Sequence, residues 1–589
     1  MDASRSDLVI RRNRSVQTEA QGHGDRMTHV GIVRLEYPKP VSGLVNLNLD
    51  VQIYLMSLLD NASLARLVAT CHHFLEVGIR ALCGRSGKCM YYTPQLLSFL
   101  SFLRTDAPDS RSPFIKELDI DTWTWPGRPH AETDYKAEPY RSALAALLKI
   151  LRSCHNLRSL RIECGSDGKG LPMDTLYNTF SGLRSLQRLF LPVTQRTKPN
   201  LLERIGALPQ LETLALRWRG DQANSETVRP LLALHSLCHS LVELCLSTGA
   251  RMELLIPPHL AFERVRRLSI SIGCYRVSFD QLTKRAFPAL LHLTLTSDVA
   301  SRARLIRRWA EEHREYNRQR WEKDPSAWPP LVSLAADDSG VAYTLAIPQP
   351  VSFLSLQSPW DNRCEAVEVA VDVIKDARPV CLEVRITGDG VAEHSMYDAL
   401  YMANGPDYTL ERCIITFDIP AVILGSQSDA WKLFSPKLDA LVAAPGLRKA
   451  SLTHLLVRHL SDRCGPWHGH ATAPPILADP RYQFTASTYS YHEGIAPQME
   501  RFAYRCSSHL RWVGFCPKGS APRFWKATHH SGNTEGYESD GSDASVRTRL
   551  APFTTLEEAD EDTASRVLKE DMQCAPGTSD LWHWYKDYH

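Results

Sequence analysis

The segments LRSLRI (157–162) and LQRLFL (186–191) share one pattern, in which apolar residues frame a central leucine. Four more copies follow in order at LETLAL (211–216), LVELCL (241–246), VRRLSI (265–270) and LLHLTL (290–295). Their central leucines stand at 160, 189, 214, 244, 268 and 293, so successive steps are 29, 25, 30, 24 and 25 residues. Such self-similarity at steps of 24–30 residues indicates a repeat architecture.

The repeat predicts its own secondary structure. Leu-x-apolar alternation is typical of a short strand, because alternate side chains of a strand face one side. RSALAALLKILRSC (141–154) and ETVRPLLALHSLCHS (226–240) carry apolar residues at helical spacing between such strands. One repeat cannot bury its apolar face alone, so neighbours must stack. We therefore predict an α/β fold, an irregular solenoid with parallel strands inside and helices outside.

The pattern resembles the leucine-rich repeat family over at least 115–297, including an earlier copy, IKELDI (115–120). That family places Asn or Cys three residues after the last strand leucine, where it hydrogen-bonds between turns. The corresponding residues here are Gly165, Thr194, Arg219, Gly249 and Gly273. The resemblance therefore implies repeats without this side-chain ladder.

The pattern weakens after residue 297. The segment 301–323 reads as a charged helix with a solvated face, and we expect 298–349 to be a charged helical insertion or an irregular repeat. For 350–526 two readings stay open, a continuation of the irregular repeats or a separate α/β cap. Looser candidate strands are VSFLSL (351–356), AVEVAV (366–371), LERCII (410–415), LRKASL (447–452), MERFAY (499–504) and LRWVGF (510–515).

A second feature precedes the repeats, at LNLDVQIYLMSLLDNASLARLVATCHHF (47–74). Apolar residues occupy nearly every side of its first helix, at Leu47, Leu49, Val51, Ile53, Leu55, Met56, Leu58 and Leu59. A helix that is apolar all round is buried on several sides. A small bundle cannot cover them all, so a protein partner is expected. Fully burying each such side chain contributes roughly 1.5–3 kcal/mol.

This stretch resembles the F-box, a small helical motif that binds the Skp adaptor of SCF-type ubiquitin ligases. The match begins with Leu47-Asn48-Leu49-Asp50 and continues through Leu59-Asp60-Asn61. Asn48 stands where the family has proline, and Thr70 where it has valine. The resemblance implies adaptor-binding residues Leu47, Asn48, Leu49, Val51, Leu55, Leu59, Leu64, Leu67, Cys71 and Phe74.

An F-box followed by leucine-rich repeats is the architecture of ubiquitin-ligase substrate receptors. The resemblance implies a non-catalytic receptor, joined through the adaptor to cullin and RING subunits, whose repeats bind a protein substrate. The expected substrate surface is the concave strand face, at Arg161, Arg188, Phe190, Arg217, Glu243, Arg267 and His292. Its arginines suggest a mild preference for an acidic or phosphorylated segment, and solvated strand arginines are the default reading. The alternative is a repeat scaffold whose F-box-like helices only cap the solenoid.

Composition excludes several classes of protein. The chain has 589 residues, 43% of them hydrophobic, and a net charge of +2, which gives no reason to expect nucleic acid or an anionic membrane as partner. The sequence contains no run of eighteen apolar residues, so no membrane span is predicted. Residues 1–15 lack the apolar h-region of a secretory signal. The 15 cysteines form no CxxC pair, which favours free thiols in the cytoplasm or nucleus.

No motif predicts catalysis, a cofactor or a metal. GSDGKG (165–170) lacks the spacing of a phosphate-binding loop. His454, His459, Cys464, His468 and His470 match no standard zinc spacing, and we read them as loop residues. The chain is therefore not expected to be an enzyme.

The predicted organisation is a set of successive segments. Residues 1–40 form a disordered basic tail, 41–90 the F-box-like module and 91–297 the leucine-rich repeats. The stretch 527–589 is expected to be a largely disordered acidic tail, because it is low in apolar residues. Its aromatic end, LWHWYKDY (581–588), is expected to dock on the body.

Overall fold

A computed structural model describes the chain in segments. They are residues 45–59, 61–84, 97, 99–101, 103, 111–121, 138–163, 173–180, 182–194, 199–219, 234–247, 260–272, 284–297, 303–356, 364–387, 410–418, 452–460, 499, 503, 509–517, 523–530 and 553–567. The chain divides into two compact units, Met1–Leu82 and Cys83–His589. Expectations for 1–40, 165–170 and 581–588 concern residues outside these segments.

The first unit is built from three helices, α2 (Leu49–Leu58), α3 (Asn61–Val68) and α4 (His72–Gly84). Asn48 caps α2, because its Oδ1 accepts from the backbone N–H of Asp50 at 3.0 Å. The helices enclose a core of buried residues, Met56, Leu64, Val68, Cys71 and Phe74. At Gly78 a Cβ would overlap Val68 Cγ2, so α4 approaches α3 too closely for any side chain.

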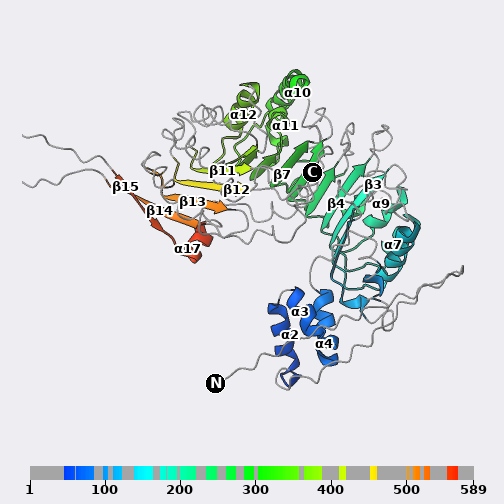
Figure 1. The fold of residues 1–589 in the computed structure, drawn as a ribbon. Coiled ribbons are helices and arrows are strands. Elements are labelled where there is room, and N and C mark those ends of the chain that lie inside the picture. The colour runs from blue at the N-terminus through cyan, green and yellow to red at the C-terminus, as the bar shows by residue number, and fades with distance from the viewer. Residues whose placement is uncertain are drawn as a thin grey trace, which may run out of the picture. The chain divides into compact units, whose positions relative to one another are not determined.

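The second unit contains one sheet of 15 strands, which follow one another in chain order (Figure 1). Strands β1 to β13 pair in parallel, whereas β14 is antiparallel to β13 and β15 antiparallel to β14. The strands are β1 (Glu117–Asp121), β2 (Ser159–Glu163), β3 (Arg188–Thr194), β4 (Thr213–Arg219), β5 (Glu243–Ser247), β6 (Arg267–Ile272), β7 (His292–Ser297), β8 (Ser333–Ala336), β9 (Phe353–Leu356), β10 (Cys381–Thr387), β11 (Arg412–Asp418), β12 (His454–Leu460), β13 (Trp512–Pro517), β14 (Arg523–His530) and β15 (Phe553–Glu558).

One row of leucines runs across the sheet in register. Each member is at most 2% exposed, which confirms that the central leucines of the repeats form the core. The leucine row consists of Leu118, Leu160, Leu189, Leu214, Leu244, Leu268, Leu293, Leu334, Leu354 and Leu382. The predicted α/β fold with a long, mostly parallel sheet of short repeated strands is confirmed.

Backbone carbonyls join successive repeats just before each strand begins. Arg158 O accepts from the N–H groups of Gln187 and Arg188, each at 2.8 Å, and Gln187 O likewise accepts from Glu212 and Thr213. A carbonyl that accepts two such bonds precedes each of β1 to β7 and β10 to β12, and its donors lie at the start of the next strand. This main-chain device couples the turns without the Asn or Cys ladder that the sequence lacks.

The described helices alternate with the strands from β1 to β4 and from β7 to β10, and neighbouring helices pack on one another in each of these two groups (Figure 1). They are α7 (Glu138–Leu151), α8 (Met173–Phe180), α9 (Pro199–Gly206), α10 (Ala303–Lys323), α11 (Ser339–Thr344), α12 (Cys364–Ala377) and α17 (Glu561–Arg566), with short 3-10 turns η1 (Ser112–Phe114) and η4 (Pro325–Ala327). The helix predicted at 141–154 is confirmed as α7. Of the helix predicted at 226–240, residues 234–237 form a 3-10 turn instead.

The segment 298–349 contains more than the expected charged helix. Strand β8 lies in it and pairs with both β7 and β9, so the sheet runs through this region without interruption. The copy LVSLAA (331–336) ends in Ala336 where other copies carry a larger apolar residue. Strands β9 to β13 then extend the same parallel ladder.

The face of α10 that the sequence leaves polar is not all solvated. Arg314 is 7% exposed and its Nη2 lies 2.6 Å from Asp376 Oδ2 on α12. Its Nη1 donates to Tyr343 O at 2.9 Å, and the guanidinium stacks on the Tyr343 ring, 4.1 Å from its centroid. The expectation of a solvated helix is therefore wrong for this face. Burial raises the pKa of Asp376, although Arg314 opposes the shift.

Two further expectations for the strands are wrong. AVEVAV (366–371) lies inside α12, because its apolar residues continue at helical spacing to Val373, Ile374 and Ala377, all buried. Residues 499 and 503 of MERFAY are helical. The strand expected at 447–452 begins later, at His454.

The segment 527–589 is not all tail. Strand β15 pairs with β14, and α17 follows it, capped by Asp560, whose Oδ1 accepts from Thr563 N at 2.7 Å. Ala564 and Val567 are buried, which gives this acidic stretch apolar anchors that its composition hides. Thus 553–567 belongs to the fold; the residues after 567 lie outside the described segments.

Candidate interaction surfaces

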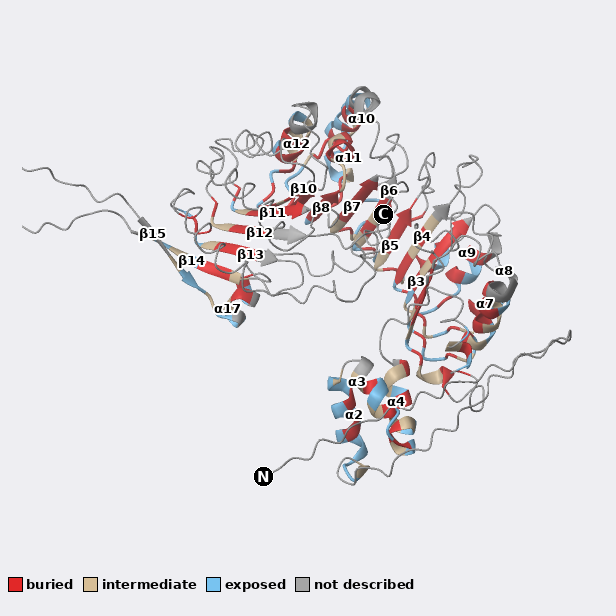
Figure 2. Cartoon of the chain, viewed as in Figure 1, coloured by how far each residue is buried: buried red, intermediate tan, exposed pale blue. Residues whose placement is uncertain are grey.

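Helix α2 carries an unusual amount of exposed apolar surface (Figure 2). Of its residues only Gln52 and Met56 are buried. Its exposed side chains range from 37% for Leu55 to 64% for Leu58. They are Leu49, Val51, Ile53, Tyr54, Leu55 and Leu58, with Leu47 just before the helix. Contiguous exposed apolar side chains mark sites of protein association.

The buried Gln52 explains why these side chains point outward. Its Nε2 donates to Val45 O at 3.0 Å and to Leu47 O at 2.9 Å. Its Oε1 lies 2.8 Å from His73 Nε2 on α4. The carboxamide thus fixes the segment before α2, and the side of the helix that carries Gln52 and Met56 faces the core.

The structure divides the expected adaptor-binding residues into two groups. Leu47, Asn48, Leu49, Val51 and Leu55 are exposed, and Leu59 and Leu67 are half-buried. By contrast, the core of the module contains Leu64, Cys71 and Phe74. The second group holds the three helices together rather than presenting a surface. The predicted adaptor-binding set omits three exposed large apolar residues of α2, Ile53, Tyr54 and Leu58.

The expected substrate residues lie on the face opposite the leucine row, here called the open face. In register across β2 to β7, its first row contains Ser159, Arg188, Thr213, Glu243, Arg267 and His292. The next row contains Arg161, Phe190, Ala215, Cys245, Ser269 and Thr294, and Arg217 stands in a third. All the predicted residues thus share one face.

The arginines of the open face do not converge on one point. Arg161 is only 5% exposed and lies 3.7 Å from Asp119 on β1. Arg188 is exposed, whereas Arg217 and Arg267 are half-buried in different rows. Because Arg161 is paired and buried, the surface that solvent reaches carries fewer positive charges than the sequence suggests.

His292 adds no positive charge near neutral pH. Its Nδ1 lies 2.8 Å from Ser333 Oγ. Burial, and then the neighbouring Arg267, lower the pKa of the imidazole. The half-buried ring therefore offers a neutral hydrogen-bonding group to a ligand.

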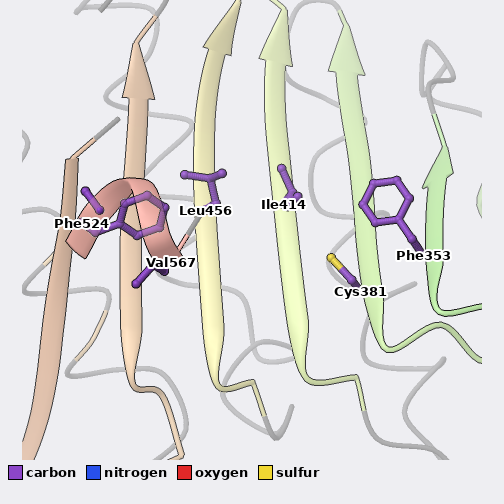
Figure 3. Packing of buried hydrophobic residues seen from close by; sticks show 7 residues of the cluster. Phe353, Cys381, Ile414, Leu456, Phe524 and Val567 are labelled. Carbon is purple, nitrogen blue, oxygen red and sulfur yellow. The ribbon is translucent and has the colours of Figure 1, made fainter. Parts of the chain in front are cut away.

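The open face changes character after β8. Phe353, Cys381, Ile414, Leu456 and Phe524 form a buried apolar cluster on it, together with Ala564 and Val567 (Figure 3). In β13, a Cβ at Gly514 would come within 2.5 Å of Phe524 and 2.8 Å of Leu456, whose side chains close over the glycine. This end of the face is a second core, with α17 packed on it.

The described cysteines have the character of core residues. Seven of them are buried thiols: Cys71, Cys83, Cys154, Cys238, Cys245, Cys381 and Cys413. Burial raises the pKa of Cys154, Cys245 and Cys413 to about 12, so these thiols are poor nucleophiles.

The histidine cluster of the sequence is only partly described. His454 and His459 lie on strand β12 rather than in a loop, and Cys464, His468 and His470 lie outside the described segments. Within those segments, no three His, Cys, Asp or Glu side chains are close enough to hold a metal ion. The helices in the same segments include none with the length and apolar character needed to cross a membrane.

Comparison of the chain with protein-family models and with curated proteins gave no match.

Proposed function

We propose that the chain is a non-catalytic substrate receptor of an SCF-type ubiquitin ligase. The observation that carries the proposal is the exposed apolar surface of α2, on a module whose core is otherwise closed. In this proposal α2 binds the Skp-type adaptor, through which cullin and RING subunits join. A handful of apolar anchors is enough for specific binding.

The substrate would bind the open face of β2 to β7. This face presents mixed charge, with exposed Arg188 and half-buried Glu243 and Arg267 in one row. Holding a substrate there raises the effective concentration of its lysines near a ubiquitin-conjugating enzyme, without bond chemistry by the receptor itself.

Co-purification with a recombinant Skp-type adaptor tests the proposed binding of α2 to the adaptor. We expect the full chain to bind, and the double variant Leu49→Asp/Ile53→Asp to lose binding at least about 100-fold, because charge cannot enter an apolar interface. Ala65→Asp, on an exposed position of α3, is the matched control and should bind normally. Failure of the folded wild-type chain to bind would reject the proposal.

A repeat scaffold capped by these helices is the second candidate. One observation favours it: α2 to α4 come before the first strand of the sheet in chain order, where a terminal cap of a repeat protein is expected. A cap predicts that deleting 45–70 unfolds the first repeats, measured by hydrogen exchange in β1 and β2. A docking module predicts unchanged protection in those strands.

A further inference from the structure

The apolar end of the open face is occupied by the chain's own residues 559–567. The backbone N–H of Ala559 donates to Phe524 O at 2.8 Å as the chain leaves β15. Ala564 and Val567 are then 2% and 1% exposed, in one cluster with Leu456 and Phe524. In Figure 3, α17 lies across the strands with Val567 beside Phe524.

Little holds this segment in place. Helix α17 has six residues, too few to be stable alone. Its cap, Asp560, is exposed, and its buried anchors are one alanine and one valine, both small. The nearby pairing of Arg523 Nε with Glu558 Oε1 at 2.6 Å belongs to the β14–β15 ladder and does not need α17.

The strands beneath are held far more firmly. Neighbouring strands from β10 to β13 are joined to one another along six or seven residue pairs. The leucine row continues under them as Leu382, Cys413, Leu455 and Val513, each fully buried. Elements with few buried contacts open at lower free energy than the core does.

The buried side chains of α17 are smaller than those of the apolar cluster beneath them. Phe524, Leu456 and Ile414 are large side chains without measurable exposure, and the described residues that the segment places on them are Ala559, Ala564 and Val567. The segment leading into those anchors, LEEADED (556–562), is strongly acidic. The segment that covers this end of the open face is therefore an acidic stretch followed by small aliphatic residues.

We propose that residues 559–567 form an intramolecular latch, which closes the apolar end of the open face and opens while the sheet stays folded. When open, the face can take a protein segment of the same chemistry, acidic residues followed by small aliphatic ones. The latch goes beyond the proposed ligase role and does not depend on adaptor binding, so the two can fail separately.

Thiol labelling of the full chain tests local opening. In the variant Ala564→Cys, mass spectrometry follows labelling of the introduced thiol and of the native Cys413, which lies on the leucine face. Each rate is normalised to the rate in urea. We expect the introduced thiol to be labelled at least about tenfold faster than Cys413, because the latch opens without the sheet. Equal rates would overturn the latch, since opening would then require global unfolding.

A second labelled position controls for the possibility that the substitution at Ala564 itself loosens α17. The thiol introduced by Val567→Cys should also be labelled faster than Cys413, and hydrogen exchange in β10 to β12 should match the wild-type chain in both variants. If the two probes disagree, with the thiol at position 567 as slow as Cys413, the latch is also overturned.

Docking of a segment is tested with a labelled peptide of residues 556–567, LEEADEDTASRV. The variant Val567→Asp, in which the latch is undocked, should bind it at least about tenfold more tightly than the wild-type chain, where the tethered segment competes at an effective concentration of ~1 mM. A peptide of the same composition in scrambled order is the control. No binding to the variant, or equal binding to both chains, would overturn the docking half.

Discussion

Gln52 Oε1 and His73 Nε2 lie 2.8 Å apart, so a buried carboxamide on α2 is joined to an imidazole on α4. The same carboxamide donates to two carbonyls before α2. Removing the carboxamide leaves the carbonyls of Val45 and Leu47 and the imidazole of His73 without this hydrogen-bond partner. Helix α2 has few buried apolar residues of its own, so this polar contact is a large part of what holds it.

The variant Gln52→Ala should destabilise the first unit by about 2–3 kcal/mol, because buried partners are left without hydrogen bonds. Hydrogen exchange of α2 to α4 in the full chain measures the loss. Ser57→Ala, which removes an exposed hydroxyl bonded to Tyr54 O, is the control and should cost no more than about 0.5 kcal/mol. Equal losses would show that Gln52 is not an anchor.

Gly78→Ala should destabilise the first unit, although alanine favours helix by about 1 kcal/mol. The added Cβ overlaps Val68 Cγ2, and overpacking of this kind costs about 1–3 kcal/mol. The double variant Gly78→Ala/Val68→Ala removes the clash, so the two substitutions should be strongly non-additive. Thermal unfolding of the four chains measures the coupling; strict additivity would contradict the close approach.

Arg314→Ala should cost about 3 kcal/mol, because it leaves Asp376 with a partly buried and unpaired charge and removes the bond to Tyr343 O. Glu315→Ala, the next residue along α10, breaks an exposed pair with Arg318 and should cost no more than about 0.5 kcal/mol. Denaturant unfolding compares the two variants. Similar losses would mean that α10 is held by its apolar residues alone.

The attachment of α17 should depend on pH. The N–H of Thr563 bonds to Asp560 and lowers the pKa of that carboxyl, with a further contribution from Arg566. A lowered folded pKa means that the ionised cap stabilises α17 above the usual pKa of Asp, and that this is lost as pH falls through the folded value. Hydrogen exchange of 561–567 should therefore speed up in acid, beyond its intrinsic pH dependence. Asp560→Asn still caps the helix and should remove the extra dependence; an unchanged profile in that variant would contradict this origin.

The leucine row could be predicted from the sequence because one strong signal repeats, a large apolar residue at a fixed place in each turn. Where that signal weakens, prediction fails for local reasons. Ala336 is too small to mark β8 by pattern. AVEVAV alternates like a strand over six residues, but over the fourteen residues of α12 the apolar residues follow helical spacing.

The addition of β15 to the sheet could not be predicted from the sequence, for a different reason. Strand β15 depends on pairing with β14, which lies well before it in the chain, and local composition carries no trace of that contact. Likewise, Arg314 reads as one charge among many on α10 until Asp376 is brought to it by α12.

The surface of α2 was predictable in part. Apolar residues on every side required that some stay exposed, and Leu49, Val51 and Leu55 do. The sequence could not separate them from Leu64, Cys71 and Phe74, since both groups are apolar residues at helical spacing. Only the packing of α3 and α4 decides which group faces inward.

The carbonyls that accept two bonds before a strand fix the start of the next strand, whatever the length of the connection between the two strands. Leu268 and Leu293 are 25 residues apart and Leu455 and Val513 are 58 apart, yet each pair lies side by side in the same parallel ladder. Lengthening a connecting loop costs little, about 0.6 kcal/mol per doubling. The chain is therefore a suitable host for a fluorescent protein or an epitope inserted between two neighbouring strands.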